Sequence, residues 1–122
     1  MAKVMVIDDE PFILMMIEDK LKSAGLEVVT RREPQGAVEE IKKERPDLLI
    51  LDWMMPEISG IDICREIKSD PDLSGIPVFM LTAKGQEDDE KLGLQCGVDR
   101  YITKPFSPRG LLEIVIEQLE SK

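Results

Sequence analysis

The 122-residue sequence contains no histidine and only two cysteines, and these shortages exclude several kinds of chemistry. Without histidine, the chain lacks the commonest general base and metal ligand, and it cannot carry a phosphohistidine. Cys64 and Cys96 fall in stretches expected to be helical and form no CxxC pair, so we interpret both as small buried hydrophobic residues. A disulfide or a thiolate metal site is therefore not expected.

Positive charge and long apolar segments are also scarce. Sixteen Lys and Arg residues stand against 25 Asp and Glu residues, which gives a formal net charge of -9. This balance argues against direct binding to nucleic acid and favours a cationic partner, such as a metal ion or a basic surface. No apolar run approaches the roughly 20 residues of a membrane helix, and the N-terminus MAKVMVID lacks the features of a signal peptide. We therefore expect a cytoplasmic protein that does not bind membranes.

The sequence does contain a regular alternation of short apolar runs and longer amphipathic runs. The apolar runs predict strands over residues 3–7, 26–30, 46–52, 76–82 and 98–103. The amphipathic runs predict helices over 11–25, 34–45, 60–69, 86–96 and 107–122, with Pro34 in the first turn of the second helix. This alternation predicts an α/β fold, a mostly parallel sheet with helices on both faces. We see no linker or second domain, so residues 1–122 are interpreted as one domain.

Polar side chains stand at the carboxyl ends of four predicted strands. These residues are Asp8 and Asp9, followed by Glu10, after the first strand, Asp52 at the third, Thr82 at the fourth, where Ala83 follows it, and Lys104 after the fifth. In a parallel sheet these ends share one edge, which is where open α/β sheets bind ligands. Each residue alone has an ordinary explanation, such as a helix cap, a strand residue or a solvated amine. Together they supply three aspartates, a hydroxyl and an amine at one place.

This combination of groups fits phosphoryl transfer. Crowded carboxylates repel one another, so a cation is expected, and ligands that are all oxygen suit Mg²⁺ or Mn²⁺. A carboxylate can also attack phosphorus as a nucleophile and form an aspartyl phosphate. The metal ion, Lys104 and the Thr82 hydroxyl would then each neutralise one phosphoryl oxygen during in-line transfer.

Four sequence blocks carry a family resemblance. The blocks DDEP (8–11), LDWMMPEISG (51–60), LTAK (81–84) and YITKPF (101–106) resemble the receiver domain of two-component response regulators, in an order and spacing that match over essentially the whole chain. The resemblance implies a flavodoxin-like (βα)5 three-layer sandwich with strand order 2-1-3-4-5. It also implies a signalling switch, not an enzyme, that assists its own Mg²⁺-dependent phosphorylation and autodephosphorylation.

The resemblance assigns the phosphoacceptor and the metal ligands. It implies that Asp52 is phosphorylated and also contacts the metal ion. Asp9 is expected to be a direct ligand, the backbone carbonyl of Met54 another, and Asp8 a ligand acting through water. Met54 lies two residues past Asp52 and offers no hydrogen bond to orient a hydrolytic water, so we expect slow autodephosphorylation unless Lys84 compensates.

The resemblance also assigns the switch. Thr82 is expected to move toward the phosphoryl group, which the Ala83 amide and Lys104 also contact, and Tyr101 then turns inward. The bond between Lys104 and Pro105 is expected to be cis. These changes would repack the face formed by the fourth helix, fifth strand and fifth helix.

The implied partners are a sensor histidine kinase or a phosphotransfer protein, and an output domain or a downstream protein. A monomer or a phosphorylation-dependent dimer is expected. The strand sequence DRY (99–101) and the arginine-free helix sequence GLLEIVIEQL (110–119) argue against the symmetric dimer of receivers that are joined to winged-helix domains.

The sequence disfavours three alternative functions. An aspartate-based phosphohydrolase would carry a DxDx(T/V) motif after the first strand, where this chain reads DDEPF. A flavodoxin-like FMN carrier would have a loop rich in Ser, Thr and Gly there, whereas DDEP repels phosphate. A degenerate receiver that only binds partners is disfavoured because the set Asp8, Asp9, Asp52, Thr82 and Lys104 is intact.

Overall fold

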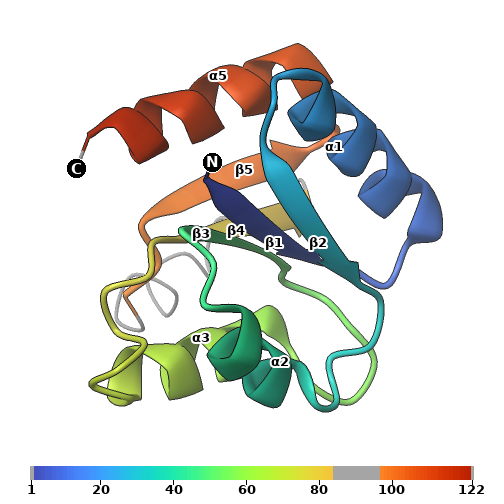
Figure 1. The fold of residues 1–122 in the computed structure, drawn as a ribbon. Coiled ribbons are helices and arrows are strands. Elements are labelled where there is room, and N and C mark those ends of the chain that lie inside the picture. Colours follow the sequence, from blue (N-terminus) through green and yellow to red (C-terminus); the bar gives the residue numbers. More distant parts are fainter. Residues whose placement is uncertain (1, 84–96, 122) are drawn as a thin grey trace.

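A computed structural model describes residues 2–83 and 97–121 of the chain (Figure 1). The described strands are β1 (Lys3–Ile7), β2 (Glu27–Arg31), β3 (Leu48–Asp52), β4 (Val78–Ala83) and β5 (Arg100–Lys104). The described helices are α1 (Pro11–Ser23), α2 (Ala37–Glu44), α3 (Gly60–Ser69) and α5 (Pro108–Glu120). The predicted helix over 86–96, Lys84 and Cys96 lie outside the described residues.

The strands form one parallel sheet in the order β2-β1-β3-β4-β5, which confirms the expected strand order. Helices α1 and α5 cover one face of the sheet, and α2 and α3 cover the other (Figure 1). The described chain is thus a three-layer α/β sandwich of the flavodoxin-like type. None of the helices in the described ranges is long and apolar enough to cross a membrane.

The two faces of the sheet bury two separate hydrophobic clusters. Because successive side chains of a strand point to opposite faces, Met5 and Leu49 pack with α2 and α3, while Val6 and Ile50 pack with α1 and α5. Burial on both faces requires continuous apolar strands, as in β3, where all five residues are buried. Cys64 is buried within α3, which confirms its interpretation as a core residue.

The second helix begins at Ala37, so the prediction of a helix from residue 34 with Pro34 in its first turn is wrong. Gly36 precedes the helix with a left-handed φ of 78°, which interrupts the helical path. The guanidinium of Arg31 donates to the carbonyls of Glu33 and Gln35 and thereby fixes the loop in a non-helical form. A sequence pattern does not reveal this contact.

Several strands begin later than their apolar runs predict. Strand β4 begins at Val78 and not at residue 76, and β5 begins at Arg100 and not at residue 98. At the start of β4, the Asp99 carboxylate accepts a hydrogen bond from the Val78 amide at 2.7 Å and pairs with Lys68 at 3.3 Å. A side chain therefore takes the place of a backbone partner at the start of β4.

Candidate functional site

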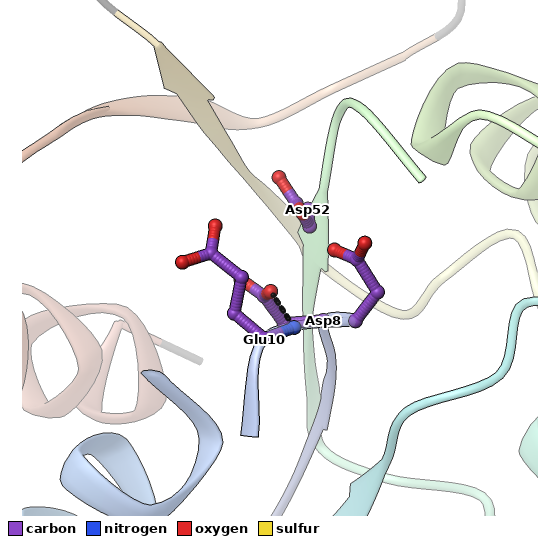
Figure 2. A group of neighbouring side chains, drawn as sticks. Asp8, Glu10 and Asp52 are labelled. Atoms are coloured by element: carbon purple, nitrogen blue, oxygen red, sulfur yellow. Dashed lines mark hydrogen bonds between the residues drawn. The ribbon is translucent and has the colours of Figure 1, made fainter. Parts of the chain in front are cut away.

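Four carboxylates meet at the carboxyl ends of β1 and β3. Asp8, Asp9 and Glu10 follow β1, Asp52 ends β3, and these two strands are hydrogen-bonded neighbours. Each residue offers a carboxylate oxygen within 4.8 Å of the others. Figure 2 shows the carboxyl groups of Asp8, Glu10 and Asp52 gathered at this edge of the sheet. The structure therefore brings the three predicted aspartates together and adds Glu10, which the sequence reasoning left without a role.

The two aspartates deepest in this cluster are buried. Asp8 is 0% exposed and Asp52 is 4% exposed, whereas Asp9 is half-buried. One Asp8 oxygen, Oδ1, accepts the backbone N–H of Glu10 at 2.9 Å. Burying a carboxylate is costly unless it is paired, so the cluster requires positive charge.

Among the described residues, Lys104 is the cationic side chain that forms ion pairs with this cluster. Its Nζ lies 3.1 Å from Asp8 Oδ2, 3.2 Å from Asp52 Oδ1 and 3.3 Å from Glu10 Oε1. Lys104 ends β5, two strands away from β3 in the sheet, so its side chain reaches across the end of β4. The peptide bond between Lys104 and Pro105 is cis, the isomer that the family resemblance implies.

The pKa values of these groups show that the pocket holds too little positive charge. Burial, together with the charge of Asp8, raises the pKa of Asp52 to about 7, although the charge and the hydrogen bond of Lys104 act to lower it. Burial also raises the pKa of Asp8, although the hydrogen bond from the Glu10 amide and the charge of Lys104 act to lower it. Burial lowers the pKa of Lys104, but the charges and hydrogen bonds of Asp52 and Asp8 together outweigh burial, so this pKa is raised. An additional cation would stabilise both aspartates in their ionised forms.

The donor set fits a hard divalent cation. Every member of this cluster offers a carboxylate oxygen, and Mg²⁺ prefers oxygen ligands and accepts one or two carboxylates together with water. The described carboxylate cluster is therefore compatible with a divalent metal site. Nothing softer than oxygen lies in the cluster to favour a thiolate or imidazole metal.

The predicted switch residues lie on β4 and β5, next to the cluster. Thr82 is buried near the end of β4, one residue beyond the level of Asp52, because Asp52 pairs with Leu81 in the register. Ala83 follows and is exposed. Tyr101, on β5, is half-buried, and its ring centroid lies 5.9 Å from that of Trp53. Trp53 directly follows Asp52, so this aromatic contact links the site to Tyr101. The sequence analysis does not predict the contact, although a tryptophan next to the candidate phosphoacceptor indicates that an aromatic partner could lie nearby.

The loop from β3 to α3 is held against the site by short contacts. The Trp53 amide donates to the Leu81 carbonyl, and the Gly60 amide donates to the Trp53 carbonyl, both at 2.9 Å. Ser59 and Asp62 cap the start of α3 reciprocally. Gly60 lies so near β3 that a Cβ there would overlap the Asp52 carbonyl oxygen and lie 2.8 Å from Met80 Sδ. Glycine at this position lets the helix begin directly beside Asp52.

The chain matches known proteins along most of its length. Residues 4–116 match the family model described as the response regulator receiver domain. The phosphate regulon transcriptional regulatory protein PhoB of Pseudomonas aeruginosa is 47% identical over 109 residues, covering 89% of this chain and 48% of that protein. The alkaline phosphatase synthesis transcriptional regulatory protein PhoP of Bacillus subtilis is 40% identical, covering 88% of this chain and 44% of that protein. This chain spans about half the length of these relatives.

Solved structures agree with this relationship. A putative response regulator from Chloroflexus aurantiacus superposes with a TM-score of 0.90 at 32% identity, covering 98% of both chains. The chemotaxis protein CheY4 of Vibrio cholerae superposes with a TM-score of 0.89 at 30% identity, covering 96% of this chain and 98% of that one. Sequence, fold and the acidic edge of the sheet point the same way: the chain belongs to the receiver domain family of response regulators.

Proposed function

We propose that this chain is a phosphorylation-controlled switch in which Asp52 accepts a phosphoryl group in the presence of Mg²⁺. One observation carries the proposal: Asp52 is buried at the end of β3 among three further carboxylates, and a single ammonium contacts them in the described structure. Such a pocket needs a divalent cation, and the cation then favours the transfer of a phosphoryl group to a neighbouring carboxylate.

In the proposed reaction, an Asp52 carboxylate oxygen attacks the phosphorus of the donor. An oxygen–phosphorus bond forms, the bond between phosphorus and its leaving group breaks, and the leaving group takes the bonding electron pair. Asp9, Asp52 and the Met54 carbonyl would hold Mg²⁺ directly, with Asp8 acting through water. When bound, Mg²⁺ would neutralise part of the charge on the phosphoryl oxygens.

We infer the partners from the same chemistry and from the relatives. Residues 1–122 contain no histidine, so a phosphohistidine donor lies outside them, in a sensor histidine kinase or a phosphotransfer protein. Two relatives are named as transcriptional regulatory proteins. We propose that phosphorylation here likewise controls an output domain or a downstream protein. Thr82, the Ala83 amide and Tyr101 would carry the change from the phosphoryl group to the β5 side of the domain.

Phosphorylation should depend on a divalent cation. After incubation with acetyl phosphate and Mg²⁺, we expect the intact mass to increase by one phosphoryl group of about 80 Da. In excess EDTA we expect no increase, because the crowded carboxylates would repel the incoming anion. Complete modification in EDTA would contradict the metal role. If neither acetyl phosphate nor a panel of histidine kinases modified the protein in Mg²⁺, the proposed function would be wrong.

The lifetime of the phosphoryl group should depend on Met54. This side chain is 63% exposed in the loop after Asp52, and a thioether is a poor hydrogen-bond partner for water. Met54→Asn introduces an amide that can orient a hydrolytic water, so we expect the half-life of the phosphorylated protein to shorten several-fold. The decay is followed by intact mass after removal of acetyl phosphate. The control Met15→Asn changes a methionine on α1 that is 54% exposed, and it should decay like the wild type. Equal half-lives for Met54→Asn and the wild type would contradict the expectation.

A further inference from the structure

All three N–H donors of the Lys104 ammonium are engaged by carboxylates. A lysine ammonium has three donors and no acceptor. Here its hydrogen bonds go to Asp8 Oδ2 at 3.1 Å, Asp52 Oδ1 at 3.2 Å and Glu10 Oε1 at 3.3 Å. When Asp52 is phosphorylated it loses its own negative charge, so the phosphoryl group takes the place of Asp52 as a partner of the ammonium. The carboxylates of Asp8 and Glu10 then still compete with the phosphoryl oxygens for Lys104.

Asp8 and Glu10 differ greatly in what their release from Lys104 would cost. The side chains of Asp8 and Asp52 are 0% and 6% exposed, whereas the Glu10 side chain is 59% exposed. A buried carboxylate that loses its cation is left unpaired in a medium of low polarity, which is strongly unfavourable. An exposed carboxylate is simply hydrated again. Glu10, which also has the longest of the three contacts, is thus the partner that can leave most easily.

The local backbone explains why the Glu10 side chain points to Lys104. Glu10 occupies the N-cap position of α1 with an extended backbone, but its side chain makes no capping hydrogen bond. N-cap positions are usually occupied by Ser, Thr, Asp or Asn, whose short side chains reach the free amides of the helix. In addition, the Glu10 amide is bound to Asp8 Oδ1 at 2.9 Å, which fixes the residue at the edge of the pocket. The longer glutamate side chain instead reaches the ammonium.

We propose that Glu10 is a positioning residue that holds Lys104 in the unphosphorylated protein and releases it to the incoming phosphoryl group. This inference rests on the proposed function, because it assumes that Lys104 pairs with a phosphoryl group on Asp52. Glu10 then competes with the phosphoryl group for the Lys104 ammonium. The competition weakens the bound phosphoryl state and makes the switch easier to reverse.

Equilibrium binding of beryllofluoride, a mimic of the phosphoryl group on aspartate, tests this competition. The single tryptophan of the chain, Trp53, adjoins Asp52, so its fluorescence should report binding, and ¹⁹F NMR should report the bound fluoride directly. Each variant is first titrated with Mg²⁺ and then measured at a saturating concentration. We expect Glu10→Gln to bind beryllofluoride about two- to fivefold more tightly than the wild type, the range typical of one exposed ion pair.

A second variant separates contact from charge. Glu10→Asp keeps the negative charge but is one methylene shorter, so it does not reach Lys104 from the same backbone position. If Glu10 acts by holding Lys104, Glu10→Asp should bind beryllofluoride as tightly as Glu10→Gln. If Glu10→Asp instead behaves like the wild type, the negative charge alone is responsible and the proposal is overturned.

Two controls complete the experiment. Glu33 lines the same pocket as Asp9, but among the described residues it forms no ion pair with Lys104. Glu33→Gln should therefore bind beryllofluoride as tightly as the wild type. In a Lys104→Met background, Glu10→Gln should have no further effect. If the wild type binds beryllofluoride and Glu10→Gln binds it equally, only the role of Glu10 is wrong. If the wild type does not bind it at all, the proposed function fails as well.

Discussion

Asp52→Asn is expected to take up no phosphoryl group from acetyl phosphate in the presence of Mg²⁺. The amide replaces the attacking oxygen with a group that is not a nucleophile toward phosphorus, while its size and burial at the end of β3 are almost unchanged. Intact mass measures the loss. Asp19→Asn, at an exposed position of α1, should be labelled like the wild type. Labelling of Asp52→Asn to the wild-type extent would show that another residue is the phosphoacceptor.

The same substitution should stabilise the metal-free protein, and the gain should depend on pH. Burial raises the pKa of Asp52 to about 7, whereas an unfolded aspartate has a pKa of about 3.9. The folded protein therefore binds this proton more tightly than the unfolded chain does. Ionisation of Asp52 lowers the free energy of unfolding as the pH rises from about 4 to about 7. Asparagine, which does not ionise, avoids this loss.

Thermal unfolding in EDTA measures this effect. At pH 8 we expect Asp52→Asn to unfold about 4 °C or more above the wild type, which corresponds to roughly 1 kcal/mol in a domain of this size. At pH 5 the difference should be smaller, because most of the folded wild-type protein then carries the proton on Asp52. A lower Tm for Asp52→Asn at pH 8 would contradict the assignment of Asp52 as a buried carboxyl that is costly to ionise.

Gly60→Ala should have the largest effect on stability. The added methyl group would overlap the Asp52 carbonyl oxygen and lie 2.8 Å from Met80 Sδ. The backbone of β3 is held on both sides by hydrogen bonds to its neighbours and yields little, so α3 must shift away. We expect a loss of about 2 kcal/mol in the free energy of unfolding, as for other overpacked core positions. Slower phosphorylation should accompany it, since the loop that carries Met54 moves with α3.

Urea unfolding with a matched glycine tests this expectation. Gly75 has open space around the position of a Cβ and no left-handed φ, so Gly75→Ala should stay within about 0.5 kcal/mol of the wild type. A Gly60→Ala protein as stable as Gly75→Ala would mean that α3 adjusts without cost. The close approach of Gly60 to Asp52 would then not position the phosphoacceptor.

Much of the candidate site was predictable from the sequence, because the residues of each block are neighbours along the chain. The sequence predicts one common site for Asp8, Asp9, Asp52 and Lys104, and the structure brings these residues together. Each stands where an apolar strand ends, and parallel strands present these ends at one edge. The strand order, which places these strand ends next to one another, is implied by the family resemblance and not by the periodicity. Apolar patterns predict where strands occur in the sequence, but they do not predict which strands pair in the sheet.

The start of α2 shows where local patterns fail. The amphipathic pattern of residues 34–45 begins at Pro34, and proline is common in the first turn of a helix. The structure instead uses this segment as a loop that is bound by Arg31 and turned at Gly36. Arg31 belongs to the preceding strand, so no pattern within residues 34–45 contains the information.

The sequence by itself determined the alternation of strands and helices and the chemical groups of the site, since both depend on residue type and on spacing within short segments. The tertiary structure decided which groups touch. It placed Glu10 on Lys104, 94 residues away, set Trp53 against Tyr101, and brought Gly60 against the Asp52 backbone. These contacts depend on the order and register of the strands and on how closely α3 packs on the sheet. Such properties arise from burial of the whole core, and no single segment encodes them.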